Sequence, residues 1–504
     1  MRLLLSKSRF TTGVQCEKLL WWTVHEPDAP ELTVDAVLRD RFDQGLYVGR
    51  LARERFPGGV LIDRDLPLAE RAAATRAAID GRPPAIFEAA CIDGGLYVAV
   101  DVLERRAEGW SLVEVKSSTR RKDEHLPDVA VQLHVLRGAG VPVARAELMH
   151  LNAEFRLPDH GDLFARTDVT DEVESFLPEV PRLAEAFAAA LAGDLPAVAV
   201  GLHCWQPREC PLFDRCWPGD RDHIRRLYRA WKTQTVARMQ KGIHSLHDLP
   251  GHEKLSDIQT RQLRAVREDR VIVEPALADA LAAFRVPRLG FLDFETVNRA
   301  VPVWTGLGPW NQAVCQFSYH ERDADGAFIH DAYLAEGPHD PRPELVDRML
   351  AATRRADAIV MYSSFERSRI NELALQVPDR GAELQNLAAK LVDLLPIIQQ
   401  HVYHPEFRGS FSLKRVLPAL VPTLTYDDLV IVDGMMASVQ IARLLFLEHL
   451  VEDRDRTRAD LLAYCERDTW AMVELLRRLE ALAGMPPAAA PAASSPEQLD
   501  LGLA

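Results

Sequence analysis

The chain has 504 residues, a formal net charge of -14 and 47% hydrophobic side chains. This length is enough for two or three domain cores of roughly 100 to 200 residues each. No apolar run reaches the roughly 18 residues of a membrane-spanning helix, and residues 1–10 lack the layout of a signal peptide, so we expect a cytoplasmic protein. Its seven cysteines are widely and unevenly spaced, which favours metal binding over a disulfide framework.

The first half of the chain predicts an α/β domain over residues 1–220. Strand-like and helical segments alternate there, and a turn at Glu108 and Gly109 joins the two clearest strands. The expected elements are helices over 42–56, 68–79, 128–136 and 181–192 and strands over 96–103, 110–116 and 146–151.

Four residues of this half form a pattern with a chemical meaning. Asp101 lies on the first of the paired strands, Glu114 and Lys116 lie on the second, and Gln132 lies on the helix that follows. Carboxylates on adjacent strands can hold Mg²⁺ or Mn²⁺, and a nearby lysine can orient water and stabilise charge on a phosphate. A Glu-x-Lys segment alone is common in amphipathic strands, so the prediction depends on all four residues.

This order of residues resembles the PD-(D/E)XK nucleases of the RecB type. The resemblance implies a restriction-endonuclease-like fold in which Asp101 and Glu114 hold the metal, Lys116 assists the attacking water and Gln132 positions the helix or a phosphate.

Two features of that family are missing here. The segment Gly45–Gly49 contains no histidine, and Leu136 stands where a tyrosine often follows the glutamine. These departures concern the detailed catalytic arrangement more than the fold.

Three cysteines, Cys204, Cys210 and Cys216, follow one another at two equal spacings. A four-ligand site needs one more thiolate, which Cys16 can supply. One distant N-terminal cysteine and a later trio resemble the iron-sulfur subset of RecB-type nucleases, which includes AddB-like and CRISPR-adaptation nucleases. The resemblance implies a structural [4Fe-4S] cluster. Zinc and a buried trio without metal are the alternatives.

The remaining cysteines, Cys91, Cys315 and Cys465, lie in apolar or helical contexts. We expect them to be core cysteines.

Residues 221–286 predict a basic helical region between two domains. A row of arginines recurs every three residues along one side of a helix and could follow phosphates. An ordinary solvated helix face is the alternative. The segment 242–250 and the helical segment after it resemble a helix-hairpin-helix-like element, which would grip a DNA backbone, although a helical linker fits equally well. The arginines of the row are Arg261, Arg264, Arg267 and Arg270.

The segment 288–296 predicts an apolar strand that presents two acids. Asp293 and Glu295 are two residues apart and so face the same side of the strand. Buried carboxylates side by side raise each other's pKa, and a divalent cation removes this conflict. A solvated strand end is the alternative for an isolated Asp-x-Glu.

Two further acids and a tyrosine continue this pattern later in the chain. Glu366 ends the segment Tyr362–Glu366 after an apolar run, and Tyr464 and Asp468 lie four residues apart on one face of a predicted helix. With Asp293 and Glu295 ahead of them, these residues resemble the DEDD exonucleases of the RNase H-like fold.

The resemblance covers residues 287–483. It implies that Mg²⁺ or Mn²⁺ is held by four carboxylates, and that Tyr464 orients the attacking water. The expected elements are strands over 313–320 and 328–334 and helices over 343–354, 365–376, 413–420, 435–450 and 458–482. The implied ligands are Asp293, Glu295, Glu366 and Asp468.

This part of the chain also departs from its family. Glu366 stands where the family has aspartate, and Ser363 or Ser364 where it usually has asparagine. The extra methylene of a glutamate can shift the ligand and weaken catalysis. Lys414 can contact a phosphate, although a surface lysine is the alternative.

Residues 484–504 are rich in Pro, Ala and Ser and predict a disordered tail. Its last residues resemble the peptides by which bacterial polymerases and repair proteins bind the sliding clamp, although such short motifs also recur by chance. The glutamine would make polar contacts and the leucines would fill apolar pockets. The residues concerned are Gln498, Leu499, Asp500, Leu501 and Leu503.

Several motifs follow the cysteine-bearing RecB-like half: Asp-Phe-Glu-Thr at 293–296, Phe-Glu at 365–366, Gly-Ser-x-Ser-x-Lys at 409–414 and Tyr-Cys-x-x-Asp-Thr at 464–469. Their combination resembles a bacterial family of predicted nucleases, and the resemblance runs over most of the chain. We expect an α/β protein with an N-terminal PD-(D/E)XK domain, a helical middle region and a C-terminal RNase H-like domain. The predicted function is metal-dependent DNA processing by two hydrolytic domains, acting on single-stranded ends in repair or defence. The alternative is a non-catalytic or singly active DNA-binding adaptor tethered to the clamp.

Overall fold

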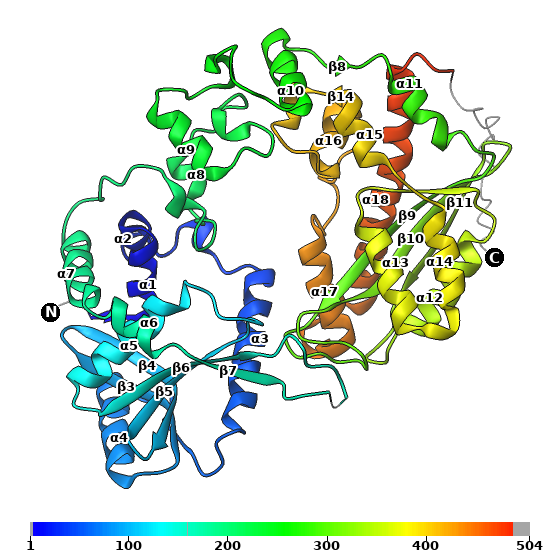
Figure 1. Cartoon of the computed structure of the whole chain (residues 1–504). Coiled ribbons are helices and arrows are strands. Elements are labelled where there is room, and N and C mark those ends of the chain that lie inside the picture. Colours follow the sequence, from blue (N-terminus) through cyan, green and yellow to red (C-terminus); the bar gives the residue numbers. More distant parts are fainter. Residues whose placement is uncertain (1–3, 159, 487–504) are drawn as a thin grey trace, which may run out of the picture. The chain divides into compact units, whose positions relative to one another are not determined.

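The computed structural model describes residues 4–158 and 160–486, so the clamp-like peptide lies outside the described residues. The chain is a mixed α/β protein that divides into two compact units (Figure 1). Unit 1 comprises Met1–Pro218 and Arg299–Asn311, and unit 2 comprises Gly219–Asn298 and Gln312–Ala504. None of the described helices is long and apolar enough to cross a membrane.

Unit 1 is built on a seven-stranded sheet with the order β2-β3-β4-β5-β6-β7, and β1 pairs with β4 outside this path. The central strands β3, β4 and β5 run antiparallel, whereas β5 and β6 are parallel. A parallel pair needs a crossover connection, and α5 (His125–Gly138) provides it. The strands are β1 (Leu5–Ser6), β2 (Val60–Leu61), β3 (Ala85–Asp93), β4 (Leu96–Arg106), β5 (Gly109–Lys116), β6 (Val143–Leu151) and β7 (Phe164–Asp168).

The helices of unit 1 pack their apolar sides on this sheet and on one another. The predicted helix over 42–56 in fact begins at Ala36 and ends at Arg53. It begins earlier because Asp35 caps it, its side chain accepting a hydrogen bond from the backbone N–H of Leu38 at 2.7 Å. The helices besides α5 are α1 (Lys7–Gln15), α2 (Glu17–His25), α3 (Ala36–Arg53), α4 (Leu68–Gly81), α6 (Thr170–Phe176), α7 (Glu179–Ala192) and α8 (Phe213–Cys216).

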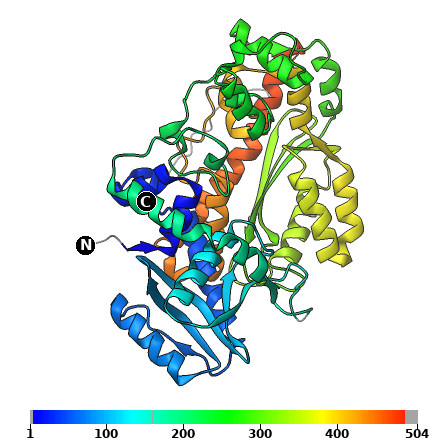
Figure 2. The same cartoon turned by 60° about the vertical axis from the view of Figure 1, so that its left-hand side comes forward.

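Unit 2 is built on a five-stranded mixed sheet with the order β11-β10-β9-β12-β13. The strands β9 to β11 are antiparallel neighbours, and β12 and β13 continue parallel to β9. Figure 2 shows these strands between the yellow helices α12 to α14 and the orange-red helices α17 and α18. The strands are β9 (Leu289–Asn298), β10 (Gln312–Arg322), β11 (Phe328–Leu334), β12 (Ala358–Met361) and β13 (Leu391–Asp393).

The helices over this sheet bring distant segments to β9. Both α17 and α18 contact β9 on one side of the sheet, and α13 contacts it on the other. The helices are α12 (Arg342–Thr353), α13 (Phe365–Gln376), α14 (Gly381–Ala389), α15 (Leu394–His401), α16 (Leu413–Leu420), α17 (Gly434–Phe446) and α18 (Arg454–Leu482).

The middle region of the chain folds into unit 2 as a small helical cluster with its own apolar core. It contains α9 (Lys232–Gln240) and α10 (Asp257–Glu268). The elements that follow, β8 (Ile272–Val273) and α11 (Leu277–Ala280), pack instead into the main core of unit 2, where β8 pairs with β14 (Val402–Tyr403). The segment expected to resemble a helix-hairpin-helix forms only a 3-10 turn over Leu246–Asp248 before α10.

The arginine row of this region is largely engaged inside unit 2. Arg261 is buried and pairs with Glu274 at 3.0 Å, and Arg264 pairs with the same carboxylate at 2.7 Å. Arg267 donates to the carbonyl of Leu249 at 3.1 Å. The expectation that these arginines follow phosphates is therefore wrong for Arg261, because its charge is already used internally.

The connection between β9 and β10, Arg299–Asn311, belongs to unit 1. Arg299 pairs with Asp40 at 2.7 Å, and the backbone N–H of Ala300 donates to Gln44 at 2.6 Å. The indole of Trp310 donates to the carbonyl of Ser117 at 2.6 Å. The sequence predicted an uninterrupted domain over 287–483 and gave no sign of this insertion.

Candidate active sites and thiol site

Three acids converge on the side of β9 that α18 contacts. Asp293 and Glu295 come from alternate positions of the strand, and Asp468 comes from the middle of α18. One carboxylate oxygen of each lies within 4.8 Å of the other two. The structure therefore brings together three of the predicted ligands across 175 residues of sequence.

The electrostatics of this group are unfavourable without a cation. Burial first, and the charge of Asp468 second, raise the pKa of Asp293 well above its ordinary value. Burial and Asp293 do the same to the pKa of Glu295, and burial raises the pKa of Asp468 to about 6. Such mutual repulsion in a buried site is what a bound divalent cation relieves.

Glu366, at the start of α13, lies close to these acids but outside the trio whose oxygens fall within 4.8 Å. Its side chain is buried, and its Oε2 has no hydrogen-bond partner among the described residues. Burial and then Asp293 raise the pKa of Glu366 well above its ordinary value. A buried, unpartnered carboxylate oxygen beside other acids fits a metal ligand, because isolation there is otherwise costly.

The turn before α13 is strained. Ser363 has a φ of +94°, a conformation that residues other than glycine rarely adopt. Its backbone N–H donates to Asp393 at 3.0 Å, and the same oxygen of Asp393 accepts from the backbone N–H of Leu395 at 2.9 Å. Asp393 therefore holds the turn that leads to Glu366.

Lys414 is the cation of this site. Its Nζ donates to the hydroxyl of Tyr464 at 2.8 Å and lies 4.7 Å from the centre of that ring. It also lies 5.3 Å from the ring of Tyr426, whose hydroxyl donates to Asp468. The alternative that Lys414 is a simple surface lysine is wrong, because its ammonium group turns inward to the tyrosines.

Both tyrosines keep their protons at neutral pH. Burial first, and Asp468 second, raise the pKa of Tyr464 and of Tyr426 far above the ordinary value. Tyr464 can therefore act as a neutral hydrogen-bond donor beside the acids.

Cys465 was expected to be an ordinary core cysteine. It is fully buried, but its thiol also donates to Oδ2 of Asp293 at 3.5 Å. Burial and Asp293 raise the pKa of this thiol well above its ordinary value, so it stays protonated. Its position next to Tyr464 on α18 could have indicated this contact.

The predicted residues of unit 1 also meet. Gln132 on α5 donates to Oε2 of Glu114 at 2.8 Å, and Lys116 donates to Oε1 of the same glutamate at 2.8 Å. Asp101 on β4 accepts a hydrogen bond from the backbone N–H of Val115 at 2.8 Å. Since β4 and β5 are hydrogen-bonded neighbours, the side chains share one end of the sheet.

Two residues of this site were missed by the sequence analysis. Lys7, at the start of α1, donates to Oε1 of Glu114 at 2.9 Å and lies 3.5 Å from Asp128. Asp128 lies one helical turn before Gln132 and also pairs with Lys116. The i, i+4 spacing of Asp128 and Gln132 could have identified the acid, whereas nothing in the sequence around Lys7 indicates its role.

The two lysines set the charge state of the acids. Burial alone would raise the pKa of Glu114, but Lys116 and Lys7 lower it below its ordinary value. Burial and then Glu114 raise the pKa of Asp101 to about 7. The site therefore holds one firmly ionised carboxylate and one that titrates near neutral pH.

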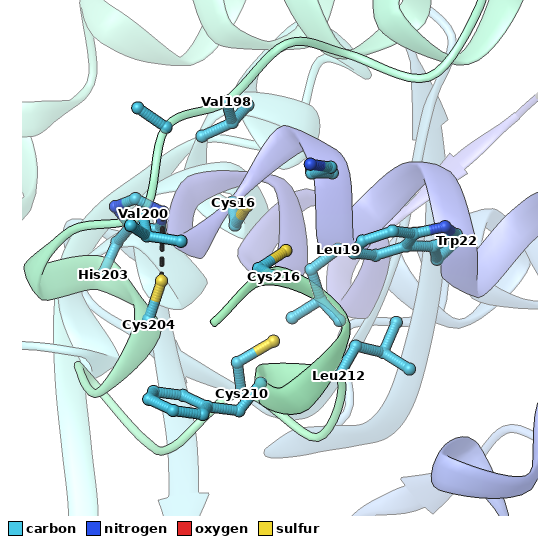
Figure 3. A pocket seen from close by; sticks show the side chains of 13 residues that line it. Cys16, Leu19, Trp22, Val198, Val200, His203, Cys204, Cys210, Leu212 and Cys216 are labelled. Carbon is cyan, nitrogen blue, oxygen red and sulfur yellow. Dashed lines mark hydrogen bonds between the residues drawn. The ribbon is translucent and has the colours of Figure 1, made fainter. Parts of the chain in front are cut away.

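The four predicted thiols meet in unit 1 (Figure 3). Cys16 ends α1, Cys204 ends a 3-10 turn, Cys210 lies in a loop and Cys216 ends α8. All four are free and line one pocket, together with Leu19, Trp22 and other apolar side chains. Burial, and then the neighbouring thiols, raise the pKa of Cys210 to about 11.

Hydrogen bonds also join the two ends of unit 1 beside this pocket. Gln15, buried next to Cys16, donates to the carbonyls of His203 and Arg208 at 3.0 and 2.8 Å. Arg215 pairs with Glu26 at 2.6 Å and with Glu31 at 2.8 Å. These contacts hold the segment of Cys16 beside the segments of the later trio.

The arrangement fits a metal group larger than one ion. Among the described residues, the groups of three or more ligand atoms within 4.8 Å of one another do not include these thiols, so no three of the four sulfurs lie that close together. A single tetrahedral zinc, with Zn–S bonds of about 2.3 Å, would hold its sulfurs roughly 3.8 Å apart.

Comparisons with known proteins give limited information. A family model described as a domain of unknown function, DUF2779, matches residues 290–412, which include Asp293, Glu295 and Glu366 but not Asp468. None of the curated proteins compared with the chain matches it.

Among solved structures, the chain is similar to the family B DNA polymerase of the hyperthermophilic archaeon Pyrobaculum calidifontis. The match has 17% sequence identity and a TM-score of 0.25, and it covers 38% of this chain and 24% of the polymerase chain. The matched region thus spans about a quarter of the polymerase, and a similarity this small assigns neither fold nor function.

Proposed function

We propose that this protein is a metal-dependent nuclease with two hydrolytic sites, one of the PD-(D/E)XK type in unit 1 and one of the DEDD type in unit 2. We place its action on single-stranded DNA ends in repair or defence. The observation that carries the proposal is the convergence of half-buried Asp293 with buried Glu295 and Asp468, with Glu366 beside them, whose Oε2 has no hydrogen-bond partner among the described residues.

In unit 2, Mg²⁺ or Mn²⁺ would polarise the phosphate and lower the pKa of the attacking water. Asp293, Glu295, Glu366 and Asp468 would hold the metal. The chain itself supplies the remaining polar groups. Tyr464, protonated and fixed by Lys414 at 2.8 Å, can donate to or orient water beside Asp468. Lys414 also supplies positive charge to the phosphate.

In unit 1, Asp101 and Glu114 would hold one Mg²⁺ or Mn²⁺. Gln132 fixes the orientation of Glu114 at 2.8 Å, and Lys116 lies where it can orient water or stabilise charge on the phosphate. Lys7 adds a second ammonium group next to the same carboxylate.

The four-cysteine site is proposed to hold a [4Fe-4S] cluster that joins the two ends of unit 1. The wide spacing of the free thiols and the apolar lining of the pocket support it over zinc. Protein purified without oxygen should be brown, and Cys210→Ala should remove the visible absorbance. Colourless protein with one zinc per chain would contradict the cluster.

The nuclease proposal is tested with single-stranded DNA labelled at either end, in Mg²⁺ or Mn²⁺. Asp293→Ala should remove the unit 2 activity and Lys116→Ala the unit 1 activity, each by about 10³-fold or more, since each loses several kcal/mol of transition-state stabilisation. The double variant should be inactive, and Lys122→Ala, an exposed lysine of unit 1, should match the wild type. Full activity in the double variant would refute the proposal.

An adaptor without catalytic activity is the second candidate. The position of Glu366 outside the close trio favours it for unit 2, because a DEDD-type site needs the fourth acid at the metal. DNA binding without cleavage in either metal would support the adaptor. Loss of sliding-clamp retention on deleting residues 498–504 would support the proposed tether in either case.

A further inference from the structure

Unit 2 has a second group of metal-ligand side chains, separate from the carboxylate site. His320 on β10, His330 on β11 and Glu466 on α18 each place one ligand atom within 4.8 Å of the other two. The two histidines lie directly opposite each other in the antiparallel register of β10 and β11. The proposed hydrolytic machinery uses none of the three.

A threonine engages one ring nitrogen of His320. Thr469 Oγ1 lies 2.8 Å from Nδ1 of His320 and 2.9 Å from the carbonyl of Glu466, to which it can donate. With Nδ1 engaged in this way, Nε2 is the nitrogen that can serve as a metal ligand.

A serine engages one ring nitrogen of His330 in the same way. Ser318 Oγ lies 3.0 Å from Nε2 of His330 and 2.9 Å from the hydroxyl of Thr469. The other nitrogen of His330, Nδ1, lies 4.0 Å from Oε1 of Glu466.

We propose that His320 Nε2, His330 Nδ1 and the Glu466 carboxylate bind one Zn²⁺ ion. Two imidazoles and a carboxylate form a common zinc ligand set, with a fourth position left to water. Metal-bound histidines usually donate their second N–H to a fixed partner, and each imidazole here has a hydroxyl oxygen within hydrogen-bond distance of its other nitrogen.

The ligands must close and one ring must turn to reach bonding geometry. The imidazoles are stacked with their centres 4.4 Å apart, and a lone pair lies in the plane of its ring. Zinc–nitrogen bonds of about 2.0 Å therefore require a movement of roughly an ångström together with a rotation of the His330 ring. His330 and Glu466 are exposed and can supply it without disturbing the core.

The site would join three elements of unit 2. Zn²⁺ would tie α18 to β10 and β11, and Asp468 follows Glu466 by two residues on α18. An ion here therefore stiffens the helix that carries an acid of the carboxylate site. Its binding is measured directly and does not depend on nuclease activity.

The test is zinc content after equilibrium dialysis of the full chain against Zn²⁺ with excess Mg²⁺ to occupy the carboxylate sites. Wild-type protein should retain one more zinc per chain than His330→Ala or Glu466→Gln. Ser318→Ala, which removes only the hydroxyl behind His330, should weaken zinc binding by about 10- to 100-fold. Zinc at the four-cysteine site is common to all variants and cancels in the comparison.

Two residues of unit 2 outside the site serve as matched controls, the exposed His449 and the half-buried Glu474. His449→Ala and Glu474→Gln change the same residue types outside the site and should bind as much zinc as the wild type. Zinc should also raise the unfolding temperature of the wild type but not of His330→Ala. Equal zinc content in wild type, His330→Ala and Glu466→Gln would overturn the proposal.

Discussion

The acid clusters of the two units have opposite charge balance. In unit 1, Glu114 contacts two ammonium groups, Lys7 at 2.9 Å and Lys116 at 2.8 Å, and its pKa is lowered. In unit 2, Asp293 and Glu295 mainly face other acids, and their pKa values are raised. Unit 1 thus keeps a ligand ionised without metal, whereas unit 2 needs a cation before its acids ionise together.

Removing Lys7 should leave Glu114 with one ammonium neighbour instead of two, which brings its charge balance closer to that of the acids in unit 2. In an Asp293→Ala background, which isolates unit 1, Lys7→Met should lower the rate of DNA cleavage by about 10²-fold, as expected for one lost charge-stabilising donor. Lys7→Arg should recover part of it, because the charge is kept. The rate is measured under single-turnover conditions at several Mn²⁺ concentrations.

The matched control for this change is Lys122→Met, which alters an exposed lysine of the same unit. The cluster absorbance should be unchanged in both variants, since Lys7 lies at the opposite end of α1 from Cys16. Equal rates for Lys7→Met and Lys122→Met would show that Lys7 is only a structural partner of Glu114.

Metal should stabilise unit 2 by relieving the repulsion among its acids. A ligand at 100 times its dissociation constant adds about 2.7 kcal/mol to the free energy of unfolding. Mn²⁺ should therefore raise the unfolding temperature of unit 2 in the wild type, and Asp293→Asn should abolish most of that rise. Calorimetry with and without chelator measures it.

The same variant gives an independent check without metal. Asp293→Asn removes one of the repelling charges, so in chelator it should unfold at a higher temperature than the wild type. Glu295→Gln should likewise unfold at a higher temperature than the wild type in chelator. A lower unfolding temperature for both variants in chelator would contradict the charge balance described for unit 2.

The sequence predicted the framework of both sites well where periodicity was strong. The strand over 328–334 and the helices over 365–376 and 413–420 match β11, α13 and α16 at both ends. Among them, α16 has the regular apolar spacing, because Val416, Leu417 and Leu420 share its buried side, so local preference and packing agree there. The same regularity placed Asp293 and Glu295 on one side of their strand, which depends only on the alternation of side chains.

The parts that sequence could not show depend on distant packing. Lys7 reaches Glu114 only because α1 packs against α5, and no local pattern around a single lysine encodes that. Lys414 turns inward because two buried tyrosines lie beside it. Arg261 is diverted from solvent by Glu274, thirteen residues away. Each is a tertiary contact that overrides what residue type alone would predict.

The pH dependence should also differ between the units. The pKa of Asp101 is raised to about 7, so the folded chain binds this proton more tightly than the unfolded chain does. Asp101 therefore destabilises the metal-free protein increasingly as pH rises from about 4 to about 7. Metal binding needs the ionised form, so unit 1 activity should fall about tenfold per pH unit below 7.

The profile is measured in the Asp293→Ala background at low Mn²⁺. Raising Mn²⁺ should move the midpoint to lower pH, because metal and proton compete for the same carboxylate. Asp101→Asn should flatten the pH dependence of metal-free stability in this range. If the midpoint pH of the activity profile does not change with Mn²⁺ concentration, the titrating group is not a metal ligand.

The smallest expected effect is on stability, and it concerns one residue with a strained backbone in each unit. Ser363 has a φ of +94°, and Glu88 on β3 has a φ of +58°. Ser363→Gly should relieve strain and stabilise unit 2 by less than about 1 kcal/mol, because glycine also gains freedom when unfolded. Glu88→Gly should instead destabilise unit 1, since Glu88 is buried and pairs with Arg53 at 2.7 Å. The urea midpoints of unfolding of the two units distinguish these outcomes. If Ser363→Gly destabilises unit 2, the hydroxyl of Ser363, which accepts from the backbone N–H of Phe365 at 3.3 Å, contributes more to stability than the strain costs.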